Sequence, residues 1–256
     1  MTSTSPRAPA VRGPVHVVGA GSRLFRALAL PIETVAVSGR VDALDRLPVV
    51  PAGATVLVFA DPPDEHQTRA LFLSLLDRLP QGAGVRVIYI STISATFGAS
   101  AVFPFEGPYA RKKRMAEALL RSRDDLDVVI VRVGNVFEHG GWQAIRERCR
   151  LALLPAGYGL TAASDAASVR TAVEQALVAP RGHHIVEAWR AVPTAGLLRG
   201  VVAVPGLLGL YRAGWARLPI KLAGKLLRPA GVYLPSPDDL NAFLVSAPAS
   251  ISQVVR

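Results

Sequence analysis

The segment that decides the fold spans residues 84–119 and reads GVRVIYISTISATFGASAVFPFEGPYARKKRMAEAL. Its apolar run, Val85 to Ile90, lacks polar alternation, which is typical of a strand buried on both faces. A hydroxyl cluster and a Gly-Pro turn follow, and a helical pattern then begins near Tyr109. A buried strand followed by a helix is the repeating unit of a parallel α/β sheet, and this unit recurs along the chain.

The rest of the chain supplies further strands and helices of the same kind. Buried-type strands are expected at Val15 to Ala20, Thr34 to Ser38, Thr55 to Ala60, Val128 to Val133 and His184 to Ala188. Helices are expected at Leu24 to Leu30, after Asp61-Pro62-Pro63, and at Asp165 to Val178. Only a short helical stretch (Val41 to Leu47) and Val49-Val50 lie between the second and third strands, so we expect rudimentary structure there.

This order predicts a Rossmann-type, doubly wound parallel sheet with a small, mostly helical C-terminal lobe. The expected divisions are a disordered tail (1–13), a dinucleotide-binding domain (14–189) and a substrate lobe (190–256), to which part of 138–165 contributes. At 256 residues the chain is long enough for one such domain with an appended lobe.

The composition indicates the cellular compartment and limits the classes of binding partner. Cys149 is the only cysteine, so no intrachain disulfide forms, and Met1 to Pro14 lacks the apolar core of a signal peptide. Both features indicate the cytoplasm. The net charge is +10, but residues 188–237 hold seven basic side chains and no acidic ones. The basicity therefore belongs to one segment and does not indicate nucleic-acid binding. No zinc-type spacing predicts a metal site.

Tyr109 and Lys113 are four residues apart at the start of the helical pattern, which places a phenol and an ammonium on one helix face. A nearby cation lowers the pKa of a phenol. A hydroxyl at the preceding strand end would hold a carbonyl oxygen beside that phenol. This combination suits proton transfer to or from an alcohol while a hydride moves elsewhere.

The first strand leads into Gly19-Ala20-Gly21-Ser22, a turn that suits a phosphate approaching backbone N–H groups. As a dinucleotide motif it is incomplete, because Leu24 or Phe25 occupies the third glycine position. The end of the second strand reads Ser38-Gly39-Arg40, without the carboxylate that would bond a ribose 2′-hydroxyl. Arg40, assisted by Arg23, would pair with a 2′-phosphate, which predicts NADPH as the cofactor.

The segments PYARKKRMAEALL (108–120), VIYISTIS (87–94), VIVRVGNVFEHGG (129–141) and the C-terminal DLNAFLVSAPASISQVVR resemble an extended-type short-chain dehydrogenase/reductase. That family includes nucleotide-sugar epimerases and dehydratases. The resemblance implies that Tyr109 is the acid/base and that Lys113 is its partner and a ribose contact. It also implies that Thr92 holds the substrate oxygen, with Ser91 and Ser94 as alternatives. Gly19, Gly21 and Ser22 would face the pyrophosphate.

Residues 196–231 read GLLRGVVAVPGLLGLYRAGWARLPIKLAGKLLRPAG, a segment that is both apolar and basic. Arg199 and Pro205 interrupt it, so we expect no transmembrane span. Three roles compete: an apolar lid, a diphosphate site, or contact with an anionic membrane surface. We favour substrate capture. The lid residues would be Leu207, Leu208, Tyr211 and Trp215, and the diphosphate ligands Arg212, Arg217, Lys221 or Arg228.

The sequence thus favours an NADPH-dependent ketoreductase acting on the carbonyl of a bulky, partly apolar small molecule. An NDP-sugar epimerase, dehydratase or reductase is the alternative. It ranks second because an epimerase must retain its nicotinamide, and the dinucleotide turn is incomplete. A non-catalytic NADP(H) sensor ranks third, because a sensor does not need Tyr109 and Lys113.

Overall fold

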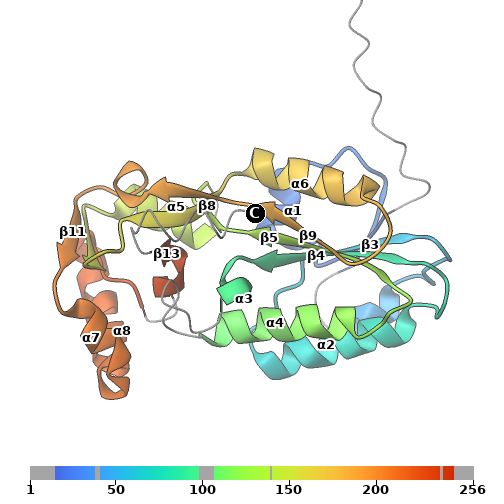
Figure 1. The fold of residues 1–256 in the computed structure, drawn as a ribbon, viewed down its shortest axis with the longest axis horizontal. Helices are drawn as coiled ribbons and strands as arrows, with labels where there is room; N and C mark the ends of the chain where they lie inside the picture. Colours follow the sequence, from blue (N-terminus) through green and yellow to red (C-terminus); the bar gives the residue numbers. More distant parts are fainter. Residues whose placement is uncertain (1–14, 38–40, 98–106, 139, 237–238, 245–256) are drawn as a thin grey trace, which may run out of the picture.

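The computed structural model describes residues 15–37, 41–97, 107–138, 140–236 and 239–244. Its centre is a parallel sheet of six strands in the order β2-β1-β3-β4-β5-β9 (Figure 1). The strands are β1 (Val15–Val18), β2 (Thr34–Val37), β3 (Thr55–Val58), β4 (Arg86–Thr92), β5 (Asp127–Val133) and β9 (His184–Ala188). The predicted Rossmann-type, doubly wound sheet is confirmed.

The strand order places a switch point at the carboxyl end of β1. β2 pairs with one edge of β1 and β3 with the other, so the chain winds outward in both directions. A crevice at such a point is where open α/β sheets bind ligands. Gly19 follows β1 with φ +94°, and a Cβ there would lie 2.5 Å from the Ala60 nitrogen. Only glycine allows this turn to pack so closely on the end of β3.

Helices cover both faces of the sheet. One face carries α2 (Glu65–Arg78) and α4 (Pro108–Arg121), and the other carries α1 (Arg23–Leu28) and α6 (Ala166–Val178) (Figure 1). Alternate β4 side chains enter the two cores. Val87 and Tyr89 belong to the core cluster that contains Leu71 of α2, whereas Ile88 belongs to the cluster that contains Val169 of α6. This alternation decides which residue at the end of β4 faces α4.

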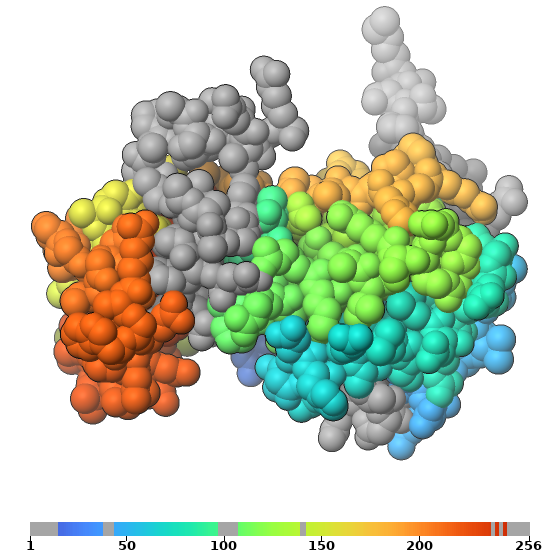
Figure 2. Space-filling model, turned by 60° about the horizontal axis from the view of Figure 1, so that its bottom comes forward, coloured from blue at the N-terminus to red at the C-terminus, as the bar shows by residue number. Residues whose placement is uncertain are grey.

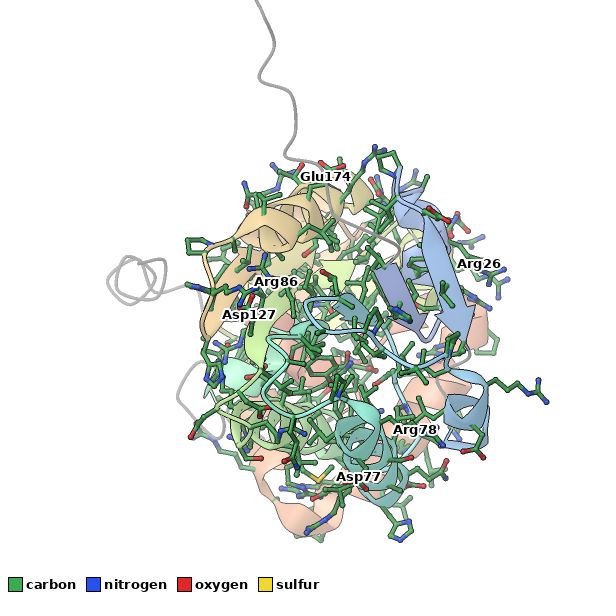
Figure 3. All side chains as sticks on the ribbon, turned by 90° about the vertical axis from the view of Figure 1, so that its right-hand side faces the viewer. Arg26, Asp77, Arg78, Arg86, Asp127 and Glu174 are labelled. Atoms are coloured by element: carbon green, nitrogen blue, oxygen red, sulfur yellow. The ribbon has the colours of Figure 1, made fainter. Side chains whose placement is uncertain are left out.

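Arg86 and Asp127 close the amino edge of the sheet. The Arg86 Nε lies 2.6 Å from an Asp127 carboxylate oxygen, and both side chains are largely buried (Figure 3). The remaining Arg86 nitrogens donate to the carbonyls of Leu177 and Ala179 at the end of α6. One guanidinium thus satisfies carbonyls that a helix C-terminus leaves unpaired. The opposite, carboxyl edge carries the candidate site.

Several predicted elements are shorter or displaced. α1 ends at Leu28, followed by Ala29 in the left-handed conformation (φ 44°), not at Leu30. α2 begins after Asp64, whose carboxylate accepts the Gln67 N–H, and not at Asp61. A 3-10 helix spans Val41–Arg46, and Val49-Val50 forms no strand. The expectation of rudimentary structure before β3 is therefore met. The predicted tail (1–13) and Ser38-Gly39-Arg40 lie outside the described residues.

Beside the main sheet, strands and helices build the lobe. A three-stranded parallel sheet joins β11 (Val201–Val204), β7 (Leu151–Pro155) and β12 (Val232–Tyr233). Another sheet joins β10 (Arg190–Pro193), β8 (Leu160–Ser164), β13 (Phe243–Leu244) and β6 (Asn135–Val136). The helices are α5 (Gly140–Arg148), α7 (Leu207–Arg212) and α8 (Arg217–Leu227). The sequence did not predict the strands of these two sheets.

No helix within the described part of the chain combines the length and apolar character needed to cross a bilayer. The longest helices, α2 and α4, have 14 residues each and lie on the sheet.

Candidate active site

Thr92 and Tyr109 meet at the carboxyl edge of the sheet. Thr92 is the last residue of β4, and Tyr109 is the second residue of α4. Their side chains are hydrogen-bonded to each other. Pro108 fixes the first position of α4, which has no need of a backbone donor. The structure therefore brings together the phenol and the hydroxyl that the sequence proposes as a catalytic pair.

The other two candidate hydroxyls are placed differently. Ser91 is 1% exposed and its Oγ donates to Glu117 of α4 at 2.6 Å. Ser94 begins the short helix α3 (Ser94–Phe97), and its N–H donates to the Thr92 Oγ1 at 3.3 Å. Of the three, the described hydrogen bonds connect only Thr92 to Tyr109.

Glu117 ties α4 to two strands beneath it. Its carboxylate accepts Nη2 of Arg132 at 2.9 Å and Nε at 3.3 Å, in addition to the Ser91 hydroxyl. Both charged side chains are buried, and each charge is balanced by the other within the protein. The Ala-Glu pair in the sequence motif thus holds α4, and with it Tyr109, against the ends of β4 and β5.

Lys113 is buried beside Tyr109. Its Nζ donates to the Ile90 carbonyl at 3.3 Å and lies 5.1 Å from the Tyr89 ring centroid. It also lies 3.4 Å from a carboxylate oxygen of Asp61. Burial lowers the pKa of the ammonium, but Tyr89 and the Asp61 carboxylate outweigh burial and raise it. Lys113 is therefore firmly charged.

Asp61 and Lys112 are site residues that the sequence analysis missed. Asp61 follows β3, and Lys112 pairs with it at 3.0 Å while donating to the Pro62 carbonyl at 2.5 Å. Burial raises the pKa of the Asp61 carboxyl, but Lys113 and Lys112 outweigh burial and lower it. The available signal was the Lys-Lys pair, one helical turn after the phenol. Asp61 itself was interpreted as a helix start.

The expected lowering of the Tyr109 pKa is wrong for this structure. Tyr109 as a whole is 42% exposed, but its hydroxyl faces Thr92. Burial of that hydroxyl and then the negative charge of Asp61 raise the pKa of the phenol, and the hydrogen bond with Thr92 lowers it only in part. The physical reason is the position of the cations. Lys112 and Lys113 lie over the ring at 5.2 and 5.7 Å from its centroid, and both are paired with Asp61. Tyr109 therefore holds its proton.

The glycine turn can hold a dinucleotide phosphate. A Cβ added at Gly21 would meet nothing within 4 Å, so the space above this exposed turn is open. Ser22, the residue before α1, makes no side-chain capping bond, which leaves its hydroxyl for a ligand. Phe25 packs on Phe59 at 5.2 Å, so an aromatic contact stands where a third glycine would allow closer helix packing. Arg23 is exposed, and Arg40 lies outside the described residues.

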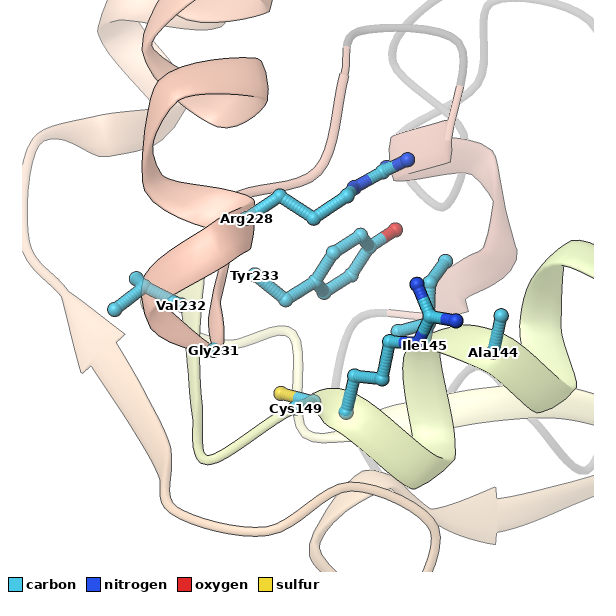
Figure 4. Close-up of a pocket in the computed structure, with 8 residues that line it drawn as sticks. Ala144, Ile145, Cys149, Arg228, Gly231, Val232 and Tyr233 are labelled. Atoms are coloured by element: carbon cyan, nitrogen blue, oxygen red, sulfur yellow. The ribbon is translucent and has the colours of Figure 1, made fainter.

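Two adjoining pockets occupy the lobe. The smaller, of about 140 Å³, is lined by Ala144, Ile145, Arg148, Cys149, Arg228, Gly231, Val232 and Tyr233 (Figure 4). Tyr233 is buried in the wall of this pocket, and its hydroxyl has no hydrogen-bond partner among the described residues. The larger, of about 810 Å³, shares Arg148 and Arg228 and adds three cations. These are Arg150, Arg199 and Lys225.

The lobe corrects two expectations about its segment. Tyr211 is not a lid residue, because it is fully buried in the lobe core and donates to the Pro235 carbonyl at 2.6 Å. Trp215 is 77% exposed, so it covers little of the protein. Of the four cations proposed for a diphosphate, only Arg228 lines these pockets.

Packing connects these pockets to the sheet edge. Phe137, three residues beyond Gly134 at the end of β5, contacts Trp142 at 5.0 Å between ring centroids. Trp142 in turn contacts Tyr233 at 6.2 Å. A short aromatic series thus leads from the carboxyl edge into the smaller pocket.

The fold is similar to that of solved proteins that contain a nicotinamide dinucleotide. MoeE5 in complex with UDP-glucuronic acid and NAD matches with a TM-score of 0.52 and 20% identity, over 75% of this chain and 86% of that chain. The UDP-glucose 4-epimerase of Thermus thermophilus, in complex with NAD, gives 0.54 and 18% over 75% and 86%. RMD from Pseudomonas aeruginosa, complexed with NADPH, gives 0.50 and 17% over 75% and 87%.

At these identities the similarity establishes the Rossmann-type fold. It agrees with the resemblance of the sequence to extended short-chain dehydrogenases/reductases. No family model and no curated protein matches the sequence.

Proposed function

We propose that the chain is a nicotinamide-dependent oxidoreductase that reduces a keto group on a nucleotide-linked sugar. The hydrogen bond between Thr92 and Tyr109, beside the charged Lys113, carries the proposal. It combines a substrate-binding hydroxyl, a proton donor and a cation at one edge of the sheet. This edge adjoins the switch point at which Rossmann-type sheets hold dinucleotides.

A bound nicotinamide would supply the hydride. Gly21 and Ser22 would contact the pyrophosphate, and Lys113 with Asp61 the ribose next to the nicotinamide. Thr92 would donate a hydrogen bond to the carbonyl oxygen of the substrate. Tyr109 would give its proton to that oxygen as an alkoxide develops.

The raised pKa of Tyr109 favours the reductive direction. A phenol that keeps its proton at neutral pH is ready to donate it, whereas oxidation of an alcohol needs the phenolate as a base. An epimerase begins with such an oxidation. The protonated phenol therefore suits the reductive step, which a reductase shares with the second half-reaction of an epimerase.

The lobe pockets support a nucleotide-linked substrate. Arg148 and Arg228, with Arg150, Arg199 and Lys225 beside them, suit a diphosphate, and the Tyr233 hydroxyl offers an additional hydrogen bond. Solved structures of the same fold hold UDP-glucuronic acid or UDP-glucose. A plain apolar ketone loses support, because Tyr211 and Trp215 form no lid.

NADPH remains the dinucleotide that we propose. The support is in the sequence, where Ser38-Gly39 lacks a carboxylate and Arg40 follows. The similar structures contain NAD or NADPH, so a nicotinamide dinucleotide fits this fold.

The test is oxidation of NADPH against UDP-, dTDP- and GDP-linked keto sugars, run beside unlinked apolar ketones. We expect turnover of a nucleotide-linked sugar. In Tyr109→Phe this turnover should fall by about a hundredfold to ten-thousandfold. Arg148→Ala should raise KM for that substrate, and Arg170→Ala, on the distant helix α6, should not. Turnover of unlinked ketones alone would overturn the substrate class, and an active Tyr109→Phe would overturn the proton donor.

A further inference from the structure

Helix α8 uses only part of its circumference to pack on the lobe. At about 100° per residue, Ile220, Ala223 and Gly224 share one side. Ile220 and Gly224 are buried. A Cβ added to Gly224 would lie 2.8 Å from the Leu234 carbonyl oxygen, so the backbones approach closely there. This side of α8 is fully occupied by the protein.

The opposite side of α8 is apolar and exposed. Leu218, Leu222 and Leu226 recur every four residues and are 65%, 50% and 80% exposed. Trp215, in the 3-10 helix Gly214–Ala216 just before α8, is 77% exposed. We call these four residues the apolar stripe. Single exposed leucines are ordinary, but a row of large apolar side chains ending in a tryptophan marks an interaction surface.

A row of cations borders the apolar stripe. Arg217, Lys221, Lys225 and Arg228 follow one another at helical spacing, between the apolar stripe and the buried side. Residues 188–237 contain no acidic side chain, so this segment supplies no carboxylate to the row. An apolar face with lysine and arginine along its border is the pattern of a helix that lies in a membrane interface. Long basic side chains there reach the phosphate level while their stems lie on apolar surface.

The position of α8 leaves this surface accessible to a flat partner. α7 and α8 project at the end of the molecule away from α2 and the sheet (Figure 1). In the space-filling view these helices, in orange, form a bulge at that end (Figure 2). A projecting helix can contact a planar surface along its length, which is about 16 Å for α8.

We propose that the apolar stripe and the bordering cations dock this protein on an anionic lipid surface. A second copy of the chain is a poorer occupant, because its own Lys221 and neighbouring cations would face those of the first. Anionic lipid supplies both an apolar phase for Trp215 and the leucines and a negative charge that complements the cations. The proposal is independent of the proposed reaction.

The test is flotation of the full-length protein with vesicles at physiological salt. Vesicles of phosphatidylcholine with about 30% phosphatidylglycerol should carry the protein, and pure phosphatidylcholine should not. The double variant Leu218→Gln/Leu222→Gln should lower the partition coefficient about tenfold or more. Lys221→Glu should lower it as well. Lys225 and Arg228 stay native in these variants because they line the lobe pockets.

Leu73→Gln provides the matched control, because Leu73 is a 41% exposed leucine on α2. It should bind vesicles like the wild type. On binding, the tryptophan emission should shift to the blue, and Trp215→Phe should abolish the shift. Equal melting temperatures for wild type and double variant show that the fold is intact.

Three results would overturn the proposal. They are no binding to anionic vesicles, binding that the folded double variant retains, and a wild-type dimer that the double variant converts to a monomer. The last result would assign the apolar stripe to a second copy. Each is separate from the oxidoreductase test, which needs no lipid.

Discussion

The Asp61 carboxylate lies 3.4 Å from the Lys113 ammonium, so the end of β3 is ion-paired with the helix that carries Tyr109. This contact changes how the tyrosine-lysine pair functions. Lys113 directs its charge to Asp61 and Tyr89, and Asp61 raises the pKa of the Tyr109 phenol. The carboxylate therefore favours the protonated form of the proposed acid.

Replacing Asp61 should move the pH dependence of the reaction. Because Asp61 raises the pKa of Tyr109, Asp61→Asn should lower that pKa. Proton donation is present below the pKa of the phenol and is lost above it. The alkaline loss of reductive turnover should then begin at a lower pH in the variant. The oxidative direction, which needs the phenolate, should become faster at a given pH.

The measurement is a pH–rate profile in both directions, with Glu65→Gln as the control. Glu65 is a half-exposed acid at the start of α2 and pairs with Arg111 at 3.6 Å, whereas the carboxylate that raises the pKa of Tyr109 is Asp61. Its profile should match that of the wild type. Identical profiles for Asp61→Asn and the wild type would show that Asp61 does not set the ionisation of Tyr109.

Replacing each of the three hydroxyl side chains near the end of β4 should affect turnover and stability differently. Thr92→Val removes the hydroxyl bonded to Tyr109 and should reduce turnover about a hundredfold to a thousandfold at nearly unchanged stability. Ser91→Ala removes a hydrogen bond to the Glu117 carboxylate. It should lower the free energy of unfolding by about 1.5–3 kcal/mol while turnover survives.

Ser94→Ala leaves the Thr92–Tyr109 contact in place and should change neither turnover nor the free energy of unfolding greatly. Thermal unfolding and steady-state kinetics on the same preparations distinguish the cases. A Ser94→Ala variant that loses turnover while Thr92→Val keeps it would reassign the substrate hydroxyl.

The cofactor preference rests on Arg40. An arginine–phosphate contact contributes about 1.5–3 kcal/mol, so Arg40→Ala should weaken NADPH roughly tenfold to a hundredfold. The affinity for NADH, which has no 2′-phosphate, should change little. Titration of both dinucleotides into wild type, Arg40→Ala and the exposed control Arg69→Ala decides the point. Equal weakening of the two, or a wild type that prefers NADH, contradicts the preference.

The sequence predicts the sheet because its central strands, β1, β3, β4 and β5, are largely apolar and buried on both faces. The run Val85 to Ile90 is too short for a typical buried helix and is rich in β-branched residues, which favours a strand. The Thr92–Tyr109 contact also follows, since the helix after a parallel strand begins at the carboxyl edge where that strand ends. Asp61 could not be assigned, because its partners Lys112 and Lys113 lie about 50 residues away and only the strand order β3-β4 brings them near.

The lobe was harder to predict, for a physical reason. β7 and β11 are short strands that pair across almost 50 residues, and their small sheet depends on tertiary contacts. The amphipathic period of Arg217–Leu227 was visible in the sequence. Which of its sides is covered was not, because that depends on the contact of Gly224 with Leu234.

The last prediction concerns the buried pair Glu117–Arg132, which joins α4 to β5 at 2.9 Å. Removing one partner leaves an uncompensated charge, so Arg132→Met should lower the free energy of unfolding by about 3–5 kcal/mol. The double variant Glu117→Gln/Arg132→Met should recover part of the loss, since it removes both charges. The exposed pair Arg170–Glu174 on α6 has the same 2.9 Å separation and is the matched control. Arg170→Ala should cost about 0.3–0.5 kcal/mol. Denaturant unfolding of the wild type and the three variants measures these free energies. Similar losses for Arg132→Met and Arg170→Ala would mean that the buried pair does not anchor α4, and with it Tyr109, to the sheet.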